Sequence, residues 1–454
     1  MEARFPETVA TQPELLAHHY TQAGCDELAI TYWQRAGRRA YERSAYVETI
    51  SHLTQGLGVL QAVPDTPQRA RQEILLQATL GAAYTAAKGY AAPDVERAYT
   101  RARVLCQQTG DTRQLFPVLV GLWNFYFVRG ESRTACALGE QLLTLAESAN
   151  DPVRRLRAHA ALGEILFHIG QLLPARTHLE QGIALYAPQQ RRSHAVQTPT
   201  IACLAYAAWT LWHLGYPDQA LQRSAEARTL AQELSHPLSL AIALHFTATL
   251  HQFRREAQAA QKWAEAATVL SREQGLPFWD GSVTIMWGWA LAAQGRGEEG
   301  LAQIRQGLVT FRATGAEVQQ PSWLALLAEA CGWAGQVAQG LNAVAEALAI
   351  MDKTGERYYE AELYRLKGEL LLQAGEGPQV LEAEAGFHQA LSVARRRQAK
   401  FLELRAAMSL SRLWQRQGKR NAARPLLAEV YSWFTEGFDT ADLQEAKALL
   451  EELS

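Results

Sequence analysis

The sequence contains little cysteine, no long apolar run and almost no net charge. Five cysteines are spread along 454 residues, too far apart for a CxxC pair or a dense disulfide framework. We interpret them as small buried residues in a reducing compartment. No apolar stretch reaches the roughly 18 residues that a membrane span requires, and the N-terminus lacks a cationic segment followed by an apolar one. The sequence therefore predicts a cytoplasmic protein.

The charges nearly cancel, with 44 Lys and Arg against 46 Asp and Glu. No global field would draw the protein to nucleic acid or to an anionic membrane, so we expect neither as a partner. At 454 residues the chain exceeds what one hydrophobic core usually serves. It should form several domains or an elongated array.

Motifs of known catalytic sites are also missing. No G-x-x-x-x-G-K-[ST] loop and no G-x-S-x-G elbow occurs. Residues 295–300, GRGEEG, match the dinucleotide pattern G-x-G-x-x-G, but that use requires a preceding strand, and the segment before them has a helical pattern. Glu164 and His168 have the spacing of a helical metal pair without an H-E-x-x-H context. We therefore expect no catalytic residue, no metal site, no cofactor and no enzyme activity.

Two basic runs are candidates for phosphate contacts, residues 394–400 (ARRRQAK) and 189–193 (QQRRS). In a helix the arginines at 395–397 spread over roughly 200 degrees instead of forming one stripe. We interpret the first run as a solvated helix end that complements the helix dipole.

What the sequence does contain is a repeat of about 40 residues. Small residues recur within apolar, helix-patterned segments, and a break follows each, usually a glycine, before a second helix-patterned segment. The small residues, to which we assign close packing between helices, are Gly81, Gly163, Ala208, Ala248, Gly288, Ala328 and Gly368. The glycine breaks are Gly130, Gly170, Gly215, Gly295, Gly335, Gly375 and Gly418. Trp123 and Ser411 hold the equivalent place of the small residue in two further repeats.

This pattern resembles the tetratricopeptide repeat, in which a small residue marks the place where one helix approaches its partner closely. The best local match is residues 161–182, ALGEILFHIGQLLPARTHLEQG. The unit here is longer than the family's, Lys367 replaces the leucine expected before Gly368, and Trp123 is not small. Longer helices explain the longer unit.

Sustained strand-like alternation is absent, and prolines fall between the helical segments. The sequence therefore predicts an all-α fold, a right-handed superhelical solenoid of antiparallel helix pairs. We expect capping helices in residues 1–65, at roughly 13–23, 27–43 and 46–61, about ten helix pairs in 66–435, and a C-terminal capping helix in 436–454. Asp439 or Thr440 can cap that last helix.

In superhelices of this kind the first helix of each pair lines the concave face, and the tetratricopeptide family uses positions −6, −3, +1, +4 and +5 from the small residue for ligands. Transferred here, these positions predict a groove rich in aromatic rings, which suits a peptide, a partner protein or a flat ligand. The candidate groove residues are Trp209, Trp212, His213, His245, Phe253, Trp289, Glu329 and Trp333. Two upstream repeats add Asn124, Phe127, Glu164, Phe167 and His168. In a unit of 40 residues the rings could instead be buried as core.

Three segments resemble a more specific family. They are residues 13–60, 356–375 (ERYYEAELYRLKGELLLQAG) and 407–453, and they are similar to the C-terminal region of bacterial adenylate/guanylate cyclase and ATPase fusion proteins. In that family a class III cyclase domain and a STAND-type P-loop ATPase precede a tetratricopeptide array. The resemblance implies that this chain is the sensor part alone, and that it restrains or releases an upstream ATPase. The family's catalytic residues have no counterpart in this sequence.

Two functions follow from these observations. The first is a non-catalytic sensor and protein-interaction array of a bacterial signalling cyclase or ATPase, which binds a protein or peptide partner on its concave face. The alternative is a small-molecule receptor, for example for a sugar, in which Trp209, Trp212, Trp289 and Trp333 stack on the ligand. An enzyme is disfavoured by the missing motifs.

Overall fold

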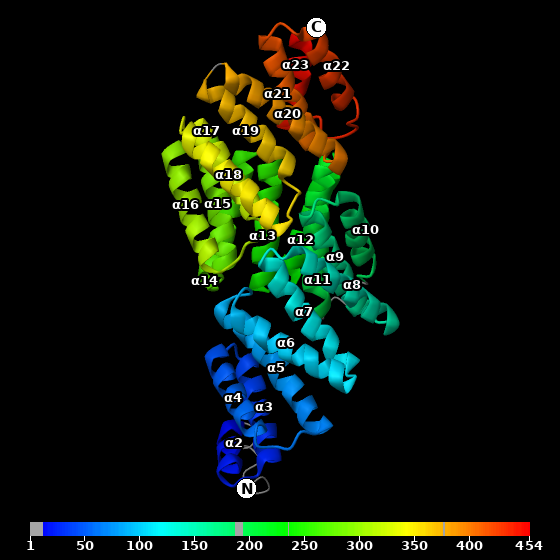
Figure 1. Cartoon of the computed structure of the whole chain (residues 1–454), viewed down its shortest axis with the longest axis vertical. Helices are drawn as coiled ribbons and strands as arrows, with labels where there is room; N and C mark the ends of the chain where they lie inside the picture. Colours follow the sequence, from blue (N-terminus) through cyan, green and yellow to red (C-terminus); the bar gives the residue numbers. More distant parts are fainter. Residues whose placement is uncertain (1–11, 187–193, 235, 376) are drawn as a thin grey trace. The chain divides into compact units, whose positions relative to one another are not determined.

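A computed structural model describes residues 12–186, 194–234, 236–375 and 377–454 of the chain (Figure 1). These residues form 22 helices and no strand, as the sequence predicts. The helices are α2 (Pro13–Gln22), α3 (Asp26–Glu42), α4 (Tyr46–Leu60), α5 (Pro67–Lys88), α6 (Pro93–Thr109), α7 (Thr112–Val128), α8 (Ser132–Ser148), α9 (Pro152–His168), α10 (Leu172–Ala184), α11 (His194–His213), α12 (Pro217–Leu234), α13 (Pro237–Phe253), α14 (Ala257–Glu273), α15 (Pro277–Ala293), α16 (Gly297–Ala313), α17 (Gln320–Trp333), α18 (Val337–Thr354), α19 (Glu360–Ala374), α20 (Pro378–Arg397), α21 (Lys400–Arg416), α22 (Arg420–Tyr431) and α23 (Ala441–Glu452). None of the described helices is both long enough and apolar enough to span a membrane.

The chain divides into two compact units. The first comprises residues up to 129 together with 140–149 and 314–316, and the second comprises 130–139, 150–313 and 317–454. The repeat pattern did not predict this division. In the first unit α2 to α7 pack each on the next, and the three predicted capping helices are present as α2, α3 and α4 with ends within a residue or so of the expected ones. Their role as a cap stays a prediction.

Contacts join eight helix pairs among the described residues, α5 with α6 and then each pair from α9 with α10 to α21 with α22, against the ten or so that the repeat predicts. The turns between the two helices of a pair lie where the breaks were predicted. All of the predicted glycine breaks have a positive φ, from 68° at Gly130 to 154° at Gly375. Glycine adopts this backbone region without the steric cost that a Cβ atom brings.

The glycines among the small residues pack against the second helix of their pair. A Cβ atom on Gly288 would lie 2.6 Å from the backbone oxygen of Gly300 on the second helix of its pair. On Gly368 it would lie 2.5 Å from Cε1 of Phe387. Glycine within a helix costs about 1 kcal/mol relative to alanine, and here it lets α15 and α19 approach α16 and α20 closely. All seven small residues are buried.

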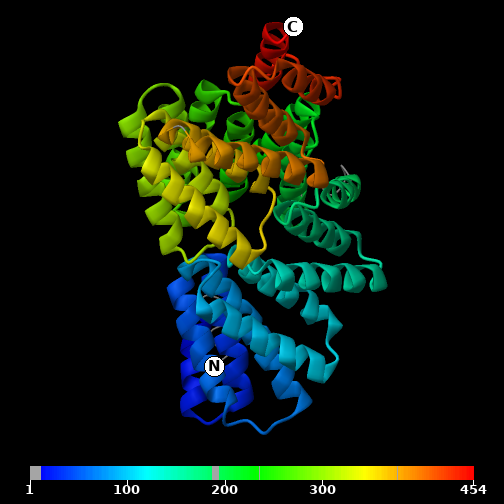
Figure 2. The same cartoon turned by 45° about the horizontal axis from the view of Figure 1, so that its top comes forward.

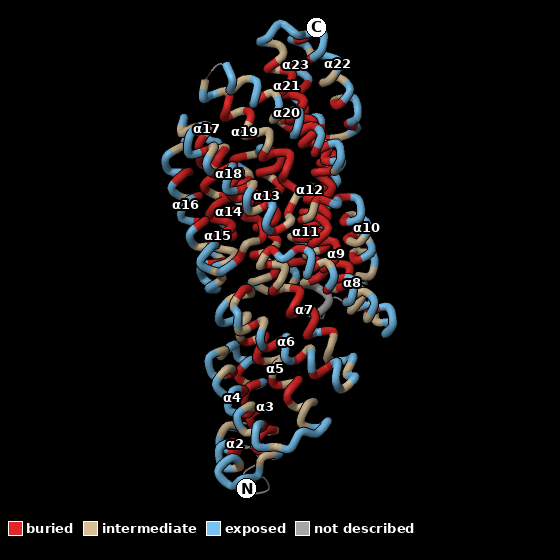
Figure 3. Tube along the Cα trace, in the orientation of Figure 1, coloured by how far each residue is buried: buried red, intermediate tan, exposed pale blue. Residues whose placement is uncertain are grey.

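In the second unit the first helices of the pairs form one continuous layer. Each of α9, α11, α13, α15, α17, α19 and α21 contacts the next in this series, and α23 packs on α21. The layer also curves back on itself, because α11 contacts α21 (Figure 2). The first helices are accordingly buried over most of their length, whereas the second helices keep exposed faces (Figure 3).

The start of the C-terminal helix α23 differs in one detail from the prediction. Thr440 is the residue before α23, as expected of a cap, but its side chain makes no capping hydrogen bond. The Thr440 hydroxyl instead donates to the backbone oxygen of Gly437 at 2.7 Å, which closes the preceding turn.

Candidate ligand pocket

A pocket of about 240 Å³ opens on the layer of first helices in the second unit. Its walls come from α17, α19, α21 and α23, together with the turn that follows α13. The lining is strongly charged, with four guanidinium and four carboxylate groups. The cations are Arg255, Arg365, Arg405 and Arg412, and the anions are Glu329, Glu369, Asp442 and Glu445.

Arg255 enters the pocket from a strained turn. It holds the place of the repeat's glycine break, and its φ is 62°, a left-handed conformation that costs a non-glycine residue about 1–2 kcal/mol. From this turn its Nη1 atom lies 3.2 Å from Asp442 Oδ1 and 2.9 Å from Glu445 Oε1. Glycine would relieve the strain but could not reach α23, so the arginine at this position points to a role for its side chain.

A buried network of ion pairs forms part of the pocket wall and extends behind it to Glu362. Arg405 holds Asp442 at 2.9 Å and Glu362 at 3.6 Å, and Arg365 holds Glu362 at 2.7 Å. Burial opposes the charged form of Glu362, but the two arginines outweigh it and lower the pKa of this carboxyl to about 2. Burial likewise opposes the charge of Arg405, yet Asp442 and Glu362 raise the pKa of its guanidinium. Glu362 and Arg405 are therefore both charged at neutral pH.

Most of the candidate groove residues are not in this pocket. The structure buries six of the eight, which are Trp209, Trp212, His213, His245, Phe253 and Trp289. A ligand could contact those side chains only if helices separated, so an open groove lined by these six rings does not form. Their part in binding stays a prediction. Burial as core, the other interpretation of the repeat, accounts for their packing.

Five of the six form one aromatic cluster. Trp209 stacks on Phe246 with ring centroids 4.1 Å apart, and Trp212 lies between Phe253 at 5.0 Å and Phe401 of α21 at 4.8 Å. His213 contacts both Trp212 and Phe253, and His245 contacts Trp209. Burial lowers the pKa of His213 to about 4 and that of His245 to about 3, so both imidazoles are neutral at pH 7.

The remaining candidates, Glu329 and Trp333, line the pocket. Trp333 is 48% exposed. Trp289 lies behind them, donating from Nε1 to Glu329 Oε2 at 2.7 Å, with its ring centroid 6.1 Å from that of Trp333. The structure thus brings these three together and separates them from the aromatic cluster. Of the upstream candidates, Glu164, Phe167 and His168 are buried in the second unit, and Asn124 and Phe127 are half-buried in the first.

Sequence reasoning missed most of the pocket, although the signal was present. The ligand positions of the tetratricopeptide family, counted from Gly368, select Arg365 at −3 and Glu369 at +1. Counted from Ser411, they select Arg405 at −6 and Arg412 at +1. These positions carry charged side chains, which an aromatic groove does not include. Arg255, by contrast, reaches the pocket from the turn after α13, which is not one of the family's ligand positions, so the repeat does not predict it.

The other motifs have structural roles. In GRGEEG, Gly295 forms the turn between α15 and α16, and Gly300 packs on Gly288. His168 pairs through Nδ1 with Glu356 at 2.7 Å and not with Glu164. Within the described ranges no group of three His, Cys, Asp or Glu residues is arranged to hold a metal ion.

The basic run at the end of α20 is engaged in ion pairs. Arg395 binds Glu403 at 2.9 Å, and Arg397 binds Glu360 at 3.0 Å and donates to the backbone oxygen of Ile169 at 3.2 Å. These two arginines are therefore not free to hold phosphates, and the end of α20 is less solvated than we expected. The second run, residues 189–193, lies outside the described residues.

Solved structures with a similar fold are helical-repeat proteins. A Rap protein complexed with Competence and Sporulation Factor has a TM-score of 0.54 at 11% identity, covering 94% of this chain and 99% of that one. The Rap conjugation gene regulator of plasmid pLS20, in complex with the Phr* peptide, has 0.52 at 14% identity, covering 81% and 96%. The APC/C hetero-tetramer Cut9–Hcn1 has 0.52 at 12% identity, covering 99% and 92%. The fold is therefore a tetratricopeptide-like helical-repeat solenoid.

The sequence comparisons add one relative. Uncharacterized protein R02095 of Rhizobium meliloti (strain 1021) is 24% identical over 407 residues, which cover 88% of this chain and 39% of that protein. The chain thus spans about two fifths of the length of the curated relative that it matches. No model of a known protein family matches the chain.

Proposed function

We propose that this chain is a non-catalytic binding array that holds a segment of a peptide or partner protein in the charged pocket of α17, α19, α21 and α23. The observation that carries the proposal is the pocket's position on the layer of first helices, at the positions that the tetratricopeptide family uses for ligands. Ligand sites in proteins are concave, with a few placed polar groups.

The size and chemistry of the pocket favour a peptide over a larger rigid ligand. A volume of about 240 Å³ lies below the usual range of roughly 300–1,000 Å³ for small-molecule sites, and it suits one or two side chains of a longer segment. The sugar alternative is weaker, because it relied on four tryptophans and only Trp333 remains exposed. One of the similar Rap structures is a complex with the Phr* peptide and another is a complex with Competence and Sporulation Factor, which supports the proposal by analogy of fold.

We further propose that binding regulates a P-loop ATPase or nucleotide cyclase, either attached or as a partner. The support is the resemblance of residues 356–375 and the two ends of the array to the sensor part of such proteins. The greater length of the Rhizobium relative is compatible with additional domains. A repeat array suits such coupling because its stability is shared between neighbouring repeats, so that a ligand can stiffen it.

A blocking substitution tests the pocket. Gln373 lies at the rim and is exposed, so Gln373→Trp should fill the pocket without disturbing the core. Gln306→Trp places the same side chain on an exposed site of the second helix α16 and is the matched control. We expect peptides selected from a random library on the wild-type chain to bind the control normally and the blocked variant at least tenfold more weakly. Equal binding to both variants would rule out the pocket.

A further inference from the structure

Among the charged groups that line the pocket, one carboxylate makes no ion pair within the described ranges. Arg365 is held by Glu362 at 2.7 Å, and Arg405 by Asp442 at 2.9 Å. Arg255 and Arg412 both bind Glu445, at 2.9 and 3.0 Å. Glu369, which lies 3.6 Å from Arg365, accepts a hydrogen bond from Ser409 at 2.5 Å. Glu329 alone makes no ion pair with any described residue.

The Glu329 carboxylate is held in position by a hydrogen bond, but no cation among the residues that the structure describes lies within ion-pair distance of it. Its Oε2 atom accepts the hydrogen bond from Trp289, which orients the carboxylate in the wall of the pocket. Burial, together with repulsion from Glu362, raises the pKa of Glu329 above its usual value, and this outweighs the opposing effects of Arg365, the Trp289 hydrogen bond and Arg405. A carboxylate in this position gains when a cation arrives.

An exposed indole lies next to this carboxylate. Trp333 follows Glu329 by four residues on α17, so the two side chains occupy the same helix face one turn apart. The face of an indole attracts a cation, and a desolvated contact is the strongest form of this interaction. A carboxylate and a tryptophan together offer both parts of a site for a guanidinium or ammonium group.

We propose that the pocket binds its ligand through a cationic anchor, an arginine or lysine side chain or an amino terminus, held between the Glu329 carboxylate and the Trp333 ring. This inference rests on the proposed function, that the pocket holds a peptide segment. An anionic anchor is disfavoured, because it would have to displace Glu362, Asp442 or Glu445 from the arginines that they already bind.

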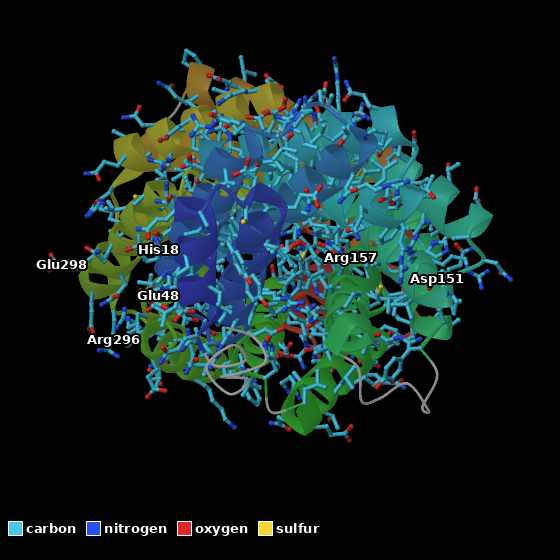
Figure 4. All side chains as sticks on the ribbon, turned by 90° about the horizontal axis from the view of Figure 1, so that it is seen from below. His18, Glu48, Asp151, Arg157, Arg296 and Glu298 are labelled. Carbon is cyan, nitrogen blue, oxygen red and sulfur yellow. The ribbon has the colours of Figure 1, made fainter. Side chains whose placement is uncertain are left out.

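The test compares Glu329→Gln with a matched control, Glu298→Gln. The amide in Glu329→Gln keeps an oxygen that can accept from Trp289, so only the charge is lost. Glu298 is exposed on α16, and its side chain points outward from that helix in Figure 4. A random heptapeptide library is selected on the wild-type chain and on both variants. We expect Arg or Lys to recur at one position among binders of the wild type and of the control, and not among binders of Glu329→Gln.

Replacement of the recurring arginine by citrulline, which keeps the shape and loses the charge, should then weaken binding to the wild type roughly tenfold or more. The same replacement should change the affinity for Glu329→Gln by less than about twofold, because this variant has already lost the carboxylate that the arginine would bind. Trp333→Ala should weaken the arginine peptide more than the citrulline peptide. An equal citrulline effect in wild type and Glu329→Gln would overturn the inference.

Failure of the inference is distinguishable from failure of the proposed function. Peptides that Gln373→Trp excludes, but that need no cation and no Glu329, leave the pocket as a binding site and overturn the cationic anchor. Peptides that bind despite Gln373→Trp overturn both. Should the library yield no binder, argininamide and citrullinamide are titrated by NMR. Saturation by argininamide that depends on Glu329 supports the anchor, and equal behaviour of the two amides overturns it.

Discussion

Two regions of the same helix layer solve the packing problem in opposite ways. In the aromatic region, around Trp209, Trp212 and Phe253, stacked rings fill the space between α11, α13 and α21. In the charged region, around Arg365, Arg405 and Asp442, buried ion pairs connect α19, α21 and α23 and leave a pocket. The stacked rings leave no open space between these helices, whereas a pocket remains between the helices that the ion pairs connect.

The difference does not follow from the position in the repeat. His213, Phe253 and Trp333 all stand five residues after the small residue of their repeat, yet they are 0%, 2% and 48% exposed. His213 and Phe253 are covered by Tyr358 and Tyr359 from the segment before α19, as well as by each other. Exposure is thus set by segments that reach a repeat from far along the chain.

The largest effect should come from Arg405→Leu in the charged region. It leaves the buried Asp442 and Glu362 carboxylates without their shared cation, and breaking a buried pair in this way costs about 3–5 kcal/mol. We expect urea denaturation at pH 7 to give a free energy of unfolding lower by that amount. Arg405 also donates to the backbone oxygen of Phe253 and lies 5.1 Å from the Trp212 ring, so the loss should be felt in both regions.

The pH dependence of this loss identifies its cause. The lowered pKa of Glu362, about 2, means that its ion pairs add stability above the unfolded pKa of about 4.5 and lose it as the pH falls toward 2. In Arg405→Leu the uncompensated carboxyls can take up protons, so the deficit should be smaller at pH 4.5 than at pH 7. A deficit that is equal at both would mean that lost packing, not charge, is responsible.

In the aromatic region Phe253→Ala should cost about 3–4 kcal/mol, the usual range for removing a fully buried ring. His213 packs on Phe253, and burial lowers the pKa of its imidazole to about 4. Opening the cluster should let this imidazole take up a proton near pH 4.5, so the cost should be somewhat smaller at pH 4.5 than at pH 7. Phe438→Ala is the control, since that ring is half exposed, and it should change the free energy of unfolding by less than about 0.5 kcal/mol.

Glu164 is a buried carboxyl on α9. Burial raises its pKa to about 7, although Arg157, labelled in Figure 4, lies 3.7 Å away and lowers it. A carboxyl whose folded pKa is raised destabilises the protein increasingly as the pH rises from its unfolded pKa of about 4.5 to about 7. The glutamine side chain of Glu164→Gln does not titrate. The free energy of unfolding of this variant, relative to that of the wild type, should therefore rise by about 1–3 kcal/mol between pH 4.5 and pH 8. Thermal unfolding across this range measures it, and a flat difference would contradict the pKa.

The sequence predicts the framework of these regions well. Small residues such as Gly288 and Gly368 must lie where helices touch, because a Cβ atom there would overlap the partner helix, and their spacing of 40 residues therefore predicts the pairs. The positive-φ breaks follow for a similar reason. These are short-range constraints, and a repeat displays them many times.

The filling of the layer is less predictable, because it depends on contacts between distant repeats. Phe401 reaches Trp212, and Arg255 reaches Asp442 across 187 residues. Neither contact produces a sequence pattern that recurs with the 40-residue period. An aromatic ligand groove and an aromatic core have the same residues at the same spacing, so the repeat left both open, and only the contacts made by α21 and by Tyr358 and Tyr359 close the rings off.

The smallest effect on stability should come from Trp333→Ala, the exposed counterpart of Phe253 in the repeat. The indole contacts Trp289 at 6.1 Å and otherwise faces the pocket, so its removal should change the free energy of unfolding by less than about 0.5 kcal/mol. Urea denaturation of Phe253→Ala and Trp333→Ala under one condition gives the contrast directly. Two equal costs would mean that the ring at 333 is core as well, and that the charged region does not remain open. A cost confined to Phe253 would mean that the repeat keeps a large aromatic side chain at 333 for a reason other than stability.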